Sequence, residues 1–202
     1  MKTISQLIIT MMICLFSIQA WAQSGKLFNT DNQLSSNLAT QVFQDKSGFI
    51  WIATRNGLNN YDGYHINVIK KDMSNFLGLN SNYINSIAQD EKEHILLGTN
   101  NSLLEFTGSE FLKIPMLDSK GEELATYVKQ VYPLKNKDIA VATSGYGIML
   151  KKQDEQKCHA MKGEVEKLKY IHKLLEDKRG RLWIITEDGK LYRKETNGRV
   201  TS

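Results

Sequence analysis

A pattern that recurs about every 45 residues is the feature that most limits what this chain can fold into. The segment Asn37–Gly63 aligns without a gap on Asn82–Gly108, and two weaker copies follow. One threonine marks each copy: Thr54, Thr99, Thr143 and Thr186. These threonines lie 45, 44 and 43 residues apart. Periods of about 40–50 residues are typical of propellers and solenoids, so we predict a repeat protein.

Each copy contains four short strand patterns separated by turn signals. In the first copy the predicted strands are Ala39–Gln44, Phe49–Thr54, Leu58–Tyr61 and Tyr64–Lys70. They are rich in apolar and β-branched residues. An Asn-Gly pair, a strong hairpin signal, separates the second strand from the third. Four antiparallel strands in about 45 residues make one propeller blade, so the predicted fold is all-β, with β-propeller-type blades.

The predicted blades span approximately residues 34–74, 79–118, 125–163 and 168–202. Only Glu164–Leu175 has apolar spacing that approaches a helix, and we predict a strand there because the other copies have one. The fourth copy stops within its last predicted strand. Propellers have about 4–8 blades, and closure removes exposed strand edges. We therefore expect an incomplete, open arc of four blades rather than a four-blade ring.

The N-terminus has the pattern of a secretory signal peptide. Met1-Lys2 is followed by the largely apolar run Leu7–Ile18 and by Ala20-Trp21-Ala22, a small-x-small cleavage site. The apolar run is short for a membrane span, and no later stretch reaches that length. We predict a signal peptide at 1–22, a mature chain of 23–202 in the periplasm, and no membrane span after residue 22. An uncleaved anchor is the alternative.

Composition argues against some partners and bonds. The chain has 26 Lys+Arg and 22 Asp+Glu, a formal net charge of +4 that is spread evenly, so we expect no nucleic-acid partner. Cleavage would remove Cys14 and leave Cys158 alone, which rules out an intramolecular disulfide. Such a domain depends on its core or on the rest of a larger fold.

The first copy resembles a known repeat. Leu34–Gly63 reads LSSNLATQVFQDKSGFIWIATRNGLNNYDG, which is similar to the two-component regulator propeller repeat. Its one departure is Ala53 in place of the usual Gly. The second copy lacks the turn Gly and the Trp, the third keeps little of the pattern, and the fourth regains Gly180 and Trp183.

The resemblance implies the periplasmic sensor region of a hybrid two-component histidine kinase. Such sensors bind oligosaccharides and switch on polysaccharide-utilisation genes. Neither a phosphate-cradling Gly-rich box nor a helix-turn-helix pattern is found in these 202 residues, so the chain resembles an N-terminal fragment of such a protein.

Several residues recur at equivalent places, and we interpret them as structural. They are Asp45, Gly48, Trp51, Thr54, Gly57, Asp90, Thr99, Thr143, Asp177, Gly180, Trp183, Thr186 and Gly189. The aspartates precede the first turn and are expected to cap it rather than to bind calcium. The tryptophans lie mid-strand and are expected in the core between blades, although aromatic rings also stack on sugars. The glycines fit a turn with positive φ.

No catalytic, cofactor or metal site is predicted. The four histidines fall at unrelated repeat positions, and we find no His-x-x-x-His, Cys-x-x-Cys or carboxylate–His pair. Cys158-His159 could suggest a thiol nucleophile, but a structural role is favoured. Exposed aromatics on turns are the better ligand candidates, and Tyr64 and Tyr146 are the two that we single out.

We therefore expect a non-enzymatic ligand-sensing module, with an oligosaccharide as its ligand. Further propeller blades or a second protomer are expected as protein partners. Two alternatives remain open: a secreted propeller enzyme acting on glycans, such as a lyase or glycosidase, and a protein-binding propeller scaffold. A glycosidase requires two carboxylates that converge on one pocket, and the acids here are scattered along the sequence.

The signal peptide is expected to be cleaved after Ala22, because Ala20-Trp21-Ala22 has the small residues that the cleavage site requires. Mass spectrometry of periplasmic material should find Gln23 at the N-terminus. An intact Met1 in that fraction would show that this segment is not cleaved.

Overall fold

Four antiparallel sheets follow one another along the chain in this computed structural model, which describes residues 25–71 and 78–202. The first sheet contains β1 (Ala39–Gln44), β2 (Ile50–Thr54), β3 (Gly57–Tyr61) and β4 (Ile66–Ile69). The second contains β5 (Ile84–Gln89), β6 (Ile95–Thr99), β7 (Leu103–Phe106) and β8 (Phe111–Ile114). The predicted signal peptide lies outside the described residues.

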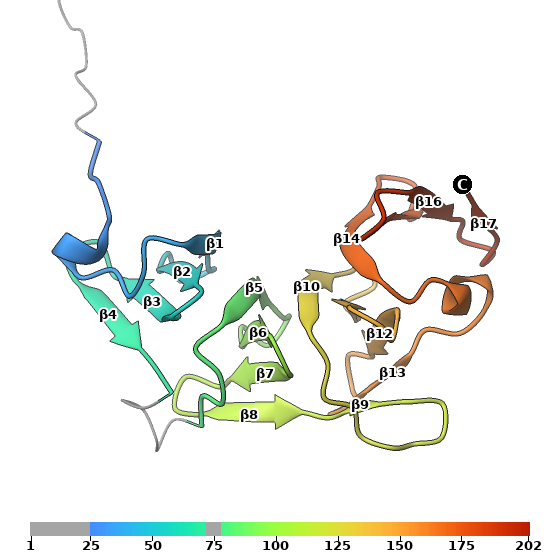
Figure 1. The fold of residues 1–202 in the computed structure, drawn as a ribbon, viewed down its shortest axis with the longest axis horizontal. Coiled ribbons are helices and arrows are strands. Elements are labelled where there is room, and N and C mark those ends of the chain that lie inside the picture. Colours follow the sequence, from blue (N-terminus) through green and yellow to red (C-terminus); the bar gives the residue numbers. More distant parts are fainter. Residues whose placement is uncertain (1–24, 72–77) are drawn as a thin grey trace, which may run out of the picture.

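The third and fourth sheets repeat this order. The third contains β10 (Val128–Pro133), β11 (Ile139–Thr143), β12 (Ile148–Lys151) and β13 (Cys158–Ala160), with β9 (Met116–Leu117) added at its outer edge. The fourth contains β14 (Ile171–Glu176), β15 (Leu182–Thr186), β16 (Leu191–Lys194) and β17 (Val200–Thr201). The sheets form an open arc, with β1, β5, β10 and β14 on its concave side (Figure 1). The predicted all-β fold of propeller-type blades in an incomplete arc is confirmed.

Three details differ from the sequence-based expectation. Residues 164–175 are not one strand, because Glu164–Lys167 form a short 3-10 helix, η2, before β14 begins. Met116-Leu117 lie within the predicted second blade, yet they pair in parallel with β13 of the third sheet. A second 3-10 helix, η1, spans Thr30–Asn32. No helix within the described ranges is long and apolar enough to cross a membrane.

The recurring threonine closes the turn between the second and third strands of every blade. Its Oγ1 donates to a backbone oxygen at the far side of the turn, over 2.8 to 3.1 Å. The pairs are Thr54 with Gly57, Thr99 with Ser102, Thr143 with Gly147 and Thr186 with Lys190. All four threonines are buried. This hydrogen bond is the physical reason that threonine recurs in all four copies.

The blades are joined by one hydrogen bond that recurs between their inner strands. A side chain on each inner strand accepts the backbone N–H at the middle of the next one, over 2.7 to 3.0 Å. The pairs are Gln41 with Ile87, Ser86 with Val131, and Gln130 with Leu174. Lys173 occupies the equivalent place in the fourth blade, and an ammonium group cannot accept such a bond.

The core is divided into three clusters, each sandwiched between two neighbouring sheets. Trp51, Ala53 and Leu58 of the first blade pack against Ile87, Ile95 and Leu97 of the second. Ala88, Leu96 and Leu103 of the second blade pack against Val131, Ile139 and Val141 of the third. Ala140, Ala142 and Ile148 of the third pack against Leu174, Leu182 and Ile184 of the fourth. Equivalent positions therefore form each interface.

The same positions are exposed at the two ends of the arc. Val42 is 63% exposed, whereas its equivalents Ile87, Val131 and Leu174 are 1%, 3% and 4% exposed. Three apolar side chains are exposed on the outer face of the fourth blade, at repeat positions that are buried or partly buried in the other blades. They are Leu175, Ile185 and Leu191. These two faces are interblade surfaces that no described part of the chain covers.

The two repeat tryptophans consequently have different surroundings. Trp51 is buried and meets Phe106 of the next blade edge to face, with ring centroids 5.9 Å apart, as the sequence predicted. Trp183 is only half-buried, and the guanidinium groups of Arg181 and Arg193 lie over its ring. The expectation of a core position is therefore wrong for Trp183 in the described chain, because its face lies at the end of the arc.

Trp51→Ala should lower the free energy of unfolding by about 3–5 kcal/mol, because it empties a packed interblade site. Trp183→Ala should cost only about 1 kcal/mol, since its ring is only partly buried and no further blade covers it among the described residues. Chemical denaturation of the two variants measures both values. Equal losses would contradict the assignment of Trp51 to a covered interface and of Trp183 to an open one.

Candidate functional site

A row of large side chains follows the concave side of the arc, one from each blade. The residue directly before each inner strand supplies it: Leu38, Tyr83, Tyr127 and Tyr170. Because these four residues precede equivalent strands, they lie at the same end of every sheet. The turns between second and third strands reach that end too. We call these four residues the tyrosine row.

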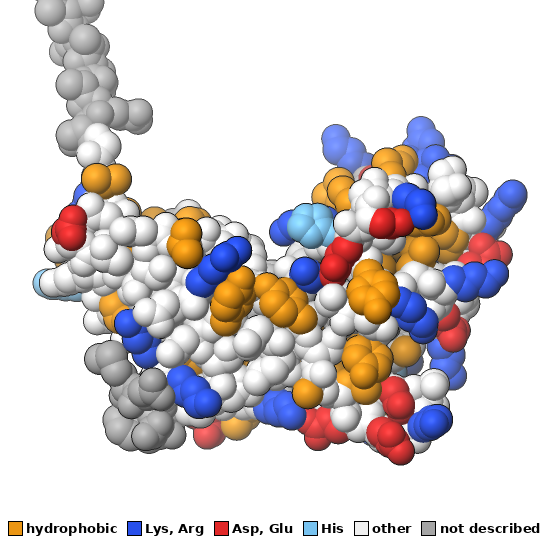
Figure 2. Space-filling model, in the orientation of Figure 1, with side chains coloured by type: hydrophobic (Ala, Val, Ile, Leu, Met, Phe, Trp, Pro, Cys, Tyr) orange, Lys and Arg blue, Asp and Glu red, His pale blue; other side chains and the backbone are white. Residues whose placement is uncertain are grey.

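Two rings of the row contact each other, and each of them also contacts a basic side chain. Tyr83 and Tyr127 meet edge to face, with centroids 6.0 Å apart. The Arg55 guanidinium lies 5.5 Å from the centroid of Tyr83, and Lys129 Nζ lies 4.5 Å from that of Tyr127. In Figure 2, hydrophobic side chains stand beside Lys and Arg side chains over β5 and β10. The surface combines flat aromatic faces with cations.

A polar side chain accompanies each of the four residues of the row. Every inner strand carries a β-bulge after its first residue, and the bulged residue lies two places after the row residue. These bulged residues are Thr40, Asn85, Lys129 and His172. Thr40 Oγ1 donates to Ile84 O of the next blade over 2.6 Å, and Asn85 Nδ2 donates to Val128 O over 2.9 Å. The side chains of Thr40 and Asn85 thus link the first blade to the second and the second blade to the third.

Tyr127 is the most constrained ring of the row. Its hydroxyl donates to Asn85 Oδ1 over 2.8 Å. The pKa of the Tyr127 phenol is raised to about 12, mainly by partial burial and in second place by the neighbouring Tyr83. The phenol therefore stays protonated throughout the physiological range and acts as a fixed hydrogen-bonding group.

A shallow cavity of about 630 Å³ adjoins the last ring. Tyr170, Thr186, Glu187, Asp188 and Tyr192 are among its lining residues. Glu187 forms an ion pair with Lys129 at 3.4 Å. A hydrogen bond from Lys190, then one from Thr186, lowers the pKa of the Asp188 carboxyl to about 2. Both acids are engaged, and a carboxylate held ionised is unsuited to act as a general acid.

The structure separates the two ligand candidates that the sequence singled out. Tyr146 lies in the turn between β11 and β12, and the N–H groups of Gly145 and Gly147 both donate to Lys169 O over 2.8 Å. These bonds hold Tyr146 near Tyr170, at one end of the row. Tyr64 lies in the turn between β3 and β4, at the opposite end of its sheet. Tyr146 thus lies at the same end of its sheet as the row, where it lines a different hollow from Tyr170, and Tyr64 lies at the opposite end of its own sheet.

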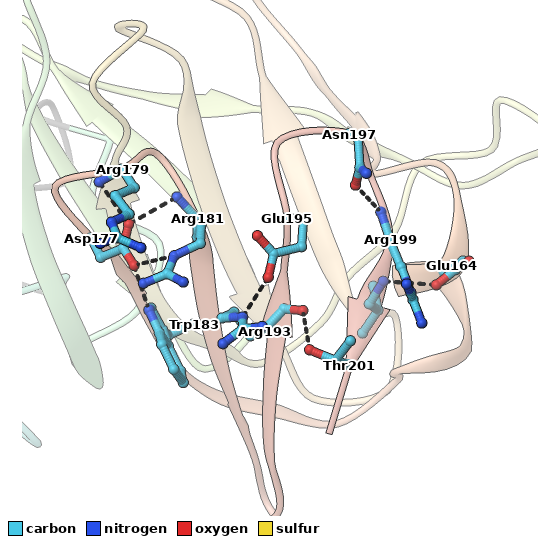
Figure 3. A network of polar contacts seen from close by, with 11 residues as sticks. Glu164, Asp177, Arg179, Arg181, Trp183, Arg193, Glu195, Asn197, Arg199 and Thr201 are labelled. Atoms are coloured by element: carbon cyan, nitrogen blue, oxygen red, sulfur yellow. Dashed lines mark hydrogen bonds and ion pairs between the residues drawn. The ribbon is translucent and has the colours of Figure 1, made fainter.

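The recurring aspartates cap their turns as predicted. Oδ1 of Asp45, Asp90 and Asp177 accepts the backbone N–H four residues later, over 2.8 to 3.1 Å. In the first and fourth blades Oδ2 also accepts the tryptophan indole N–H, over 2.7 and 3.0 Å. Figure 3 shows Asp177 with Arg179, Arg181 and Trp183 around it. The Trp183 indole is the main cause that holds the pKa of Asp177 well below its usual range.

The remaining recurring positions are also structural. Gly57, Gly147 and Gly189 have positive φ, which explains glycine at these turns. Cys158 is fully buried between the second and third blades, and burial raises the pKa of its thiol to about 12. A buried, protonated thiol is a poor nucleophile, which favours the structural role expected for it.

Two groupings escaped the sequence analysis. The tyrosine row could have been found in the sequence, because its members immediately precede the first strand of each copy. The other grouping is a carboxylate–histidine contact: His94 Nδ1 lies 3.0 Å from Glu105 Oε1 and 3.8 Å from Asp90 Oδ2. The expectation that no carboxylate–His pair occurs was therefore wrong.

Comparison with known proteins agrees with this architecture. The sequence profile described as two component regulator propeller matches residues 33–56, 78–101 and 167–188, in the first, second and fourth blades. No curated protein sequence matches the chain.

Solved structures share the fold at low sequence identity. The extracellular domain of BT4673 from B. thetaiotaomicron, described as a hybrid two component system, gives a TM-score of 0.69 at 18% identity, over 82% of this chain and 25% of that one. Virginiamycin B lyase from Staphylococcus aureus gives 0.65 at 12% identity, over 89% and 60%. An ancestral GH74 enzyme gives 0.63 at 14% identity, over 84% and 26%.

These similarities establish the fold and not the activity. The chain spans about a quarter of the length of the BT4673 domain. The repeat profile and the four successive antiparallel sheets both indicate propeller-type blades. The chain is a β-propeller protein that carries two-component regulator propeller repeats.

Proposed function

We propose that this chain is a non-enzymatic, extracytoplasmic ligand-sensing module, part of a hybrid two-component sensor in the periplasm. The repeat profile and the similarity to the BT4673 extracellular domain support the sensor role. The signal-peptide pattern at 1–22 supports export. A complete sensor of this kind would control polysaccharide-utilisation genes through parts that lie outside these residues.

The tyrosine row is the observation that carries the proposed ligand class, an oligosaccharide. Aromatic rings combine a flat apolar face with, in tyrosine, a hydroxyl that hydrogen-bonds. Sugar rings present matching apolar faces and hydroxyl groups. Rings repeated from blade to blade, with Asn85 and Lys129 beside them, suit an extended chain of sugar units more than a single small ligand.

The charged groups beside the row favour binding over catalysis. A glycosidase needs a protonated carboxylic acid and a second carboxylate on either side of the scissile bond. Here Glu187 is paired with Lys129, and Asp188 is held ionised by Lys190 and Thr186. The two exposed end faces would receive further blades of the same repeat or a second protomer, which would extend the row.

A panel of soluble glycans should contain one that binds the purified chain, and Tyr83→Ala or Tyr170→Ala should weaken that binding about tenfold, or about 1.4 kcal/mol. Each change removes one ring of the row. Isothermal titration calorimetry measures the affinity. Tyr64→Ala is the matched control, because it removes an exposed tyrosine at the opposite end of a sheet.

Two results would contradict this proposal. Unchanged affinity in both row variants would place the ligand elsewhere. Reproducible turnover of a glycan, lost on mutation of a single Asp, Glu or His, would show an enzyme.

A further inference from the structure

The second blade contains a compact group of three metal-ligating side chains, Asp90, His94 and Glu105. One ligand atom from each lies within 4.8 Å of the others. His94 Nδ1 is 3.0 Å from Glu105 Oε1 and 3.8 Å from Asp90 Oδ2. The two carboxylate side chains are each only 9% exposed and the imidazole is 30% exposed. The group therefore lies at the edge of the core, with one opening toward solvent.

The frame around this group is rigid. Asp90 and His94 bracket the turn between β5 and β6, and Asp90 N donates to His94 O over 3.0 Å. Asp90 Oδ1 accepts the backbone N–H groups of Lys92 and His94 over 2.9 and 2.8 Å. Glu105 lies on β7 in register with Leu96 of β6. Hydrogen bonds of the backbone thus set the positions of all three ligands.

Comparison with the other blades shows what is unusual here. In the first and fourth blades the second carboxylate oxygen of the turn aspartate accepts an indole N–H. Leu96 replaces that tryptophan in the second blade. Among the described residues no donor lies within hydrogen-bonding distance of Asp90 Oδ2, which faces His94. The second blade has therefore lost a neutral donor and gained an imidazole and a second acid.

The local charge is left uncompensated by the protein. Within the described chain, the ion pairs of Asp90 and Glu105 involve His94 alone. Lys92 of this turn forms no ion pair among the described residues, and Lys137 of the third blade pairs with Glu91 at 3.7 Å. Two largely buried carboxylates without a Lys or Arg partner are costly unless a cation compensates them.

We propose that Asp90, His94 and Glu105 bind a divalent transition-metal ion, with Zn²⁺ as the fitting example. One imidazole nitrogen and two carboxylate oxygens are ligands that zinc accepts, and they leave a fourth tetrahedral position for water or an external ligand. Calcium fits less well, because it requires six to eight oxygen ligands. To bind the ion through Nδ1, His94 must be a neutral imidazole with its one hydrogen on Nε2, so the Nδ1–H tautomer moves its hydrogen to Nε2 and the imidazolium form releases its Nδ1 proton to solvent.

This site is independent of the proposed sugar-binding surface. The turn between β5 and β6 lies at the opposite end of the second sheet from Tyr83. Metal binding there ties the first turn of the blade to β7, so its direct effect is on the stability of the second blade.

Zn²⁺ binding to the purified chain tests this assignment. After metal is removed with a chelator and the chelator is dialysed away, calorimetric titration should show one Zn²⁺ ion per chain, and Zn²⁺ should raise the melting temperature. His94→Phe and Glu105→Gln should each weaken Zn²⁺ binding by more than about tenfold. Mutation of a residue that only hydrogen-bonds to a metal ligand already costs about 10- to 100-fold in metal affinity. Phenylalanine is chosen at position 94 because Phe49 occupies the equivalent place in the first blade.

His65→Phe is the matched control, since His65 is an exposed imidazole with a single carboxylate, Asp62, 3.8 Å away. Circular dichroism melts without metal establish that each variant folds. A Co²⁺ spectrum without a thiolate band excludes Cys158 as a ligand. Failure of the folded wild-type chain to bind one Zn²⁺ ion, or equal binding in both site variants, would overturn the proposal.

Discussion

The packing of each sheet against the next is the interaction on which the rest of this structure depends. Every internal interface uses the same positions, such as Ile87, Val131 and Leu174, and the same hydrogen bond from the following strand to a side chain of the preceding one. A single blade has too little apolar surface on one face to be stable alone, so stability comes from stacking neighbours. The exposure of Val42 at one end and Leu175 at the other follows directly from this rule.

The same stacking creates the candidate site. The inner strands β1, β5, β10 and β14 lie on the concave side of the arc (Figure 1), and the residue before each of them therefore lies at the same end of every sheet. Tyr83 and Tyr127 therefore meet in space although they are more than 40 residues apart in sequence, and Tyr170 takes the equivalent place in the next blade. The interface positions are constrained by packing, whereas the residues at the strand ends are free to vary with the ligand. The repeated scaffold thus positions the side chains that we propose as ligand-binding, and these side chains take no part in its core clusters.

Most of the fold could be predicted from the sequence, because it depends on local patterns. Strands, turns and the capping role of Asp45 and Asp177 follow from alternation, Asx chemistry and glycine at positive φ. Three features depended on tertiary context. The full burial of Trp51 and the partial burial of Trp183 depend on whether another blade follows. The parallel pairing of β9 has no local signal. The contact of His94 with Glu105 depends on the register of β6 and β7, across eleven positions of the chain.

We propose that the tyrosine row recognises a sugar chain. Nuclear magnetic resonance spectra of the chain with ring-labelled tyrosine, recorded while an oligosaccharide that binds is titrated in, test this most directly. We expect the ring signals of Tyr83, Tyr127 and Tyr170 to shift together with a single saturation curve, while the signal of Tyr64 stays in place. Shifts confined to Tyr64, or binding that leaves all three row signals unmoved, would contradict it.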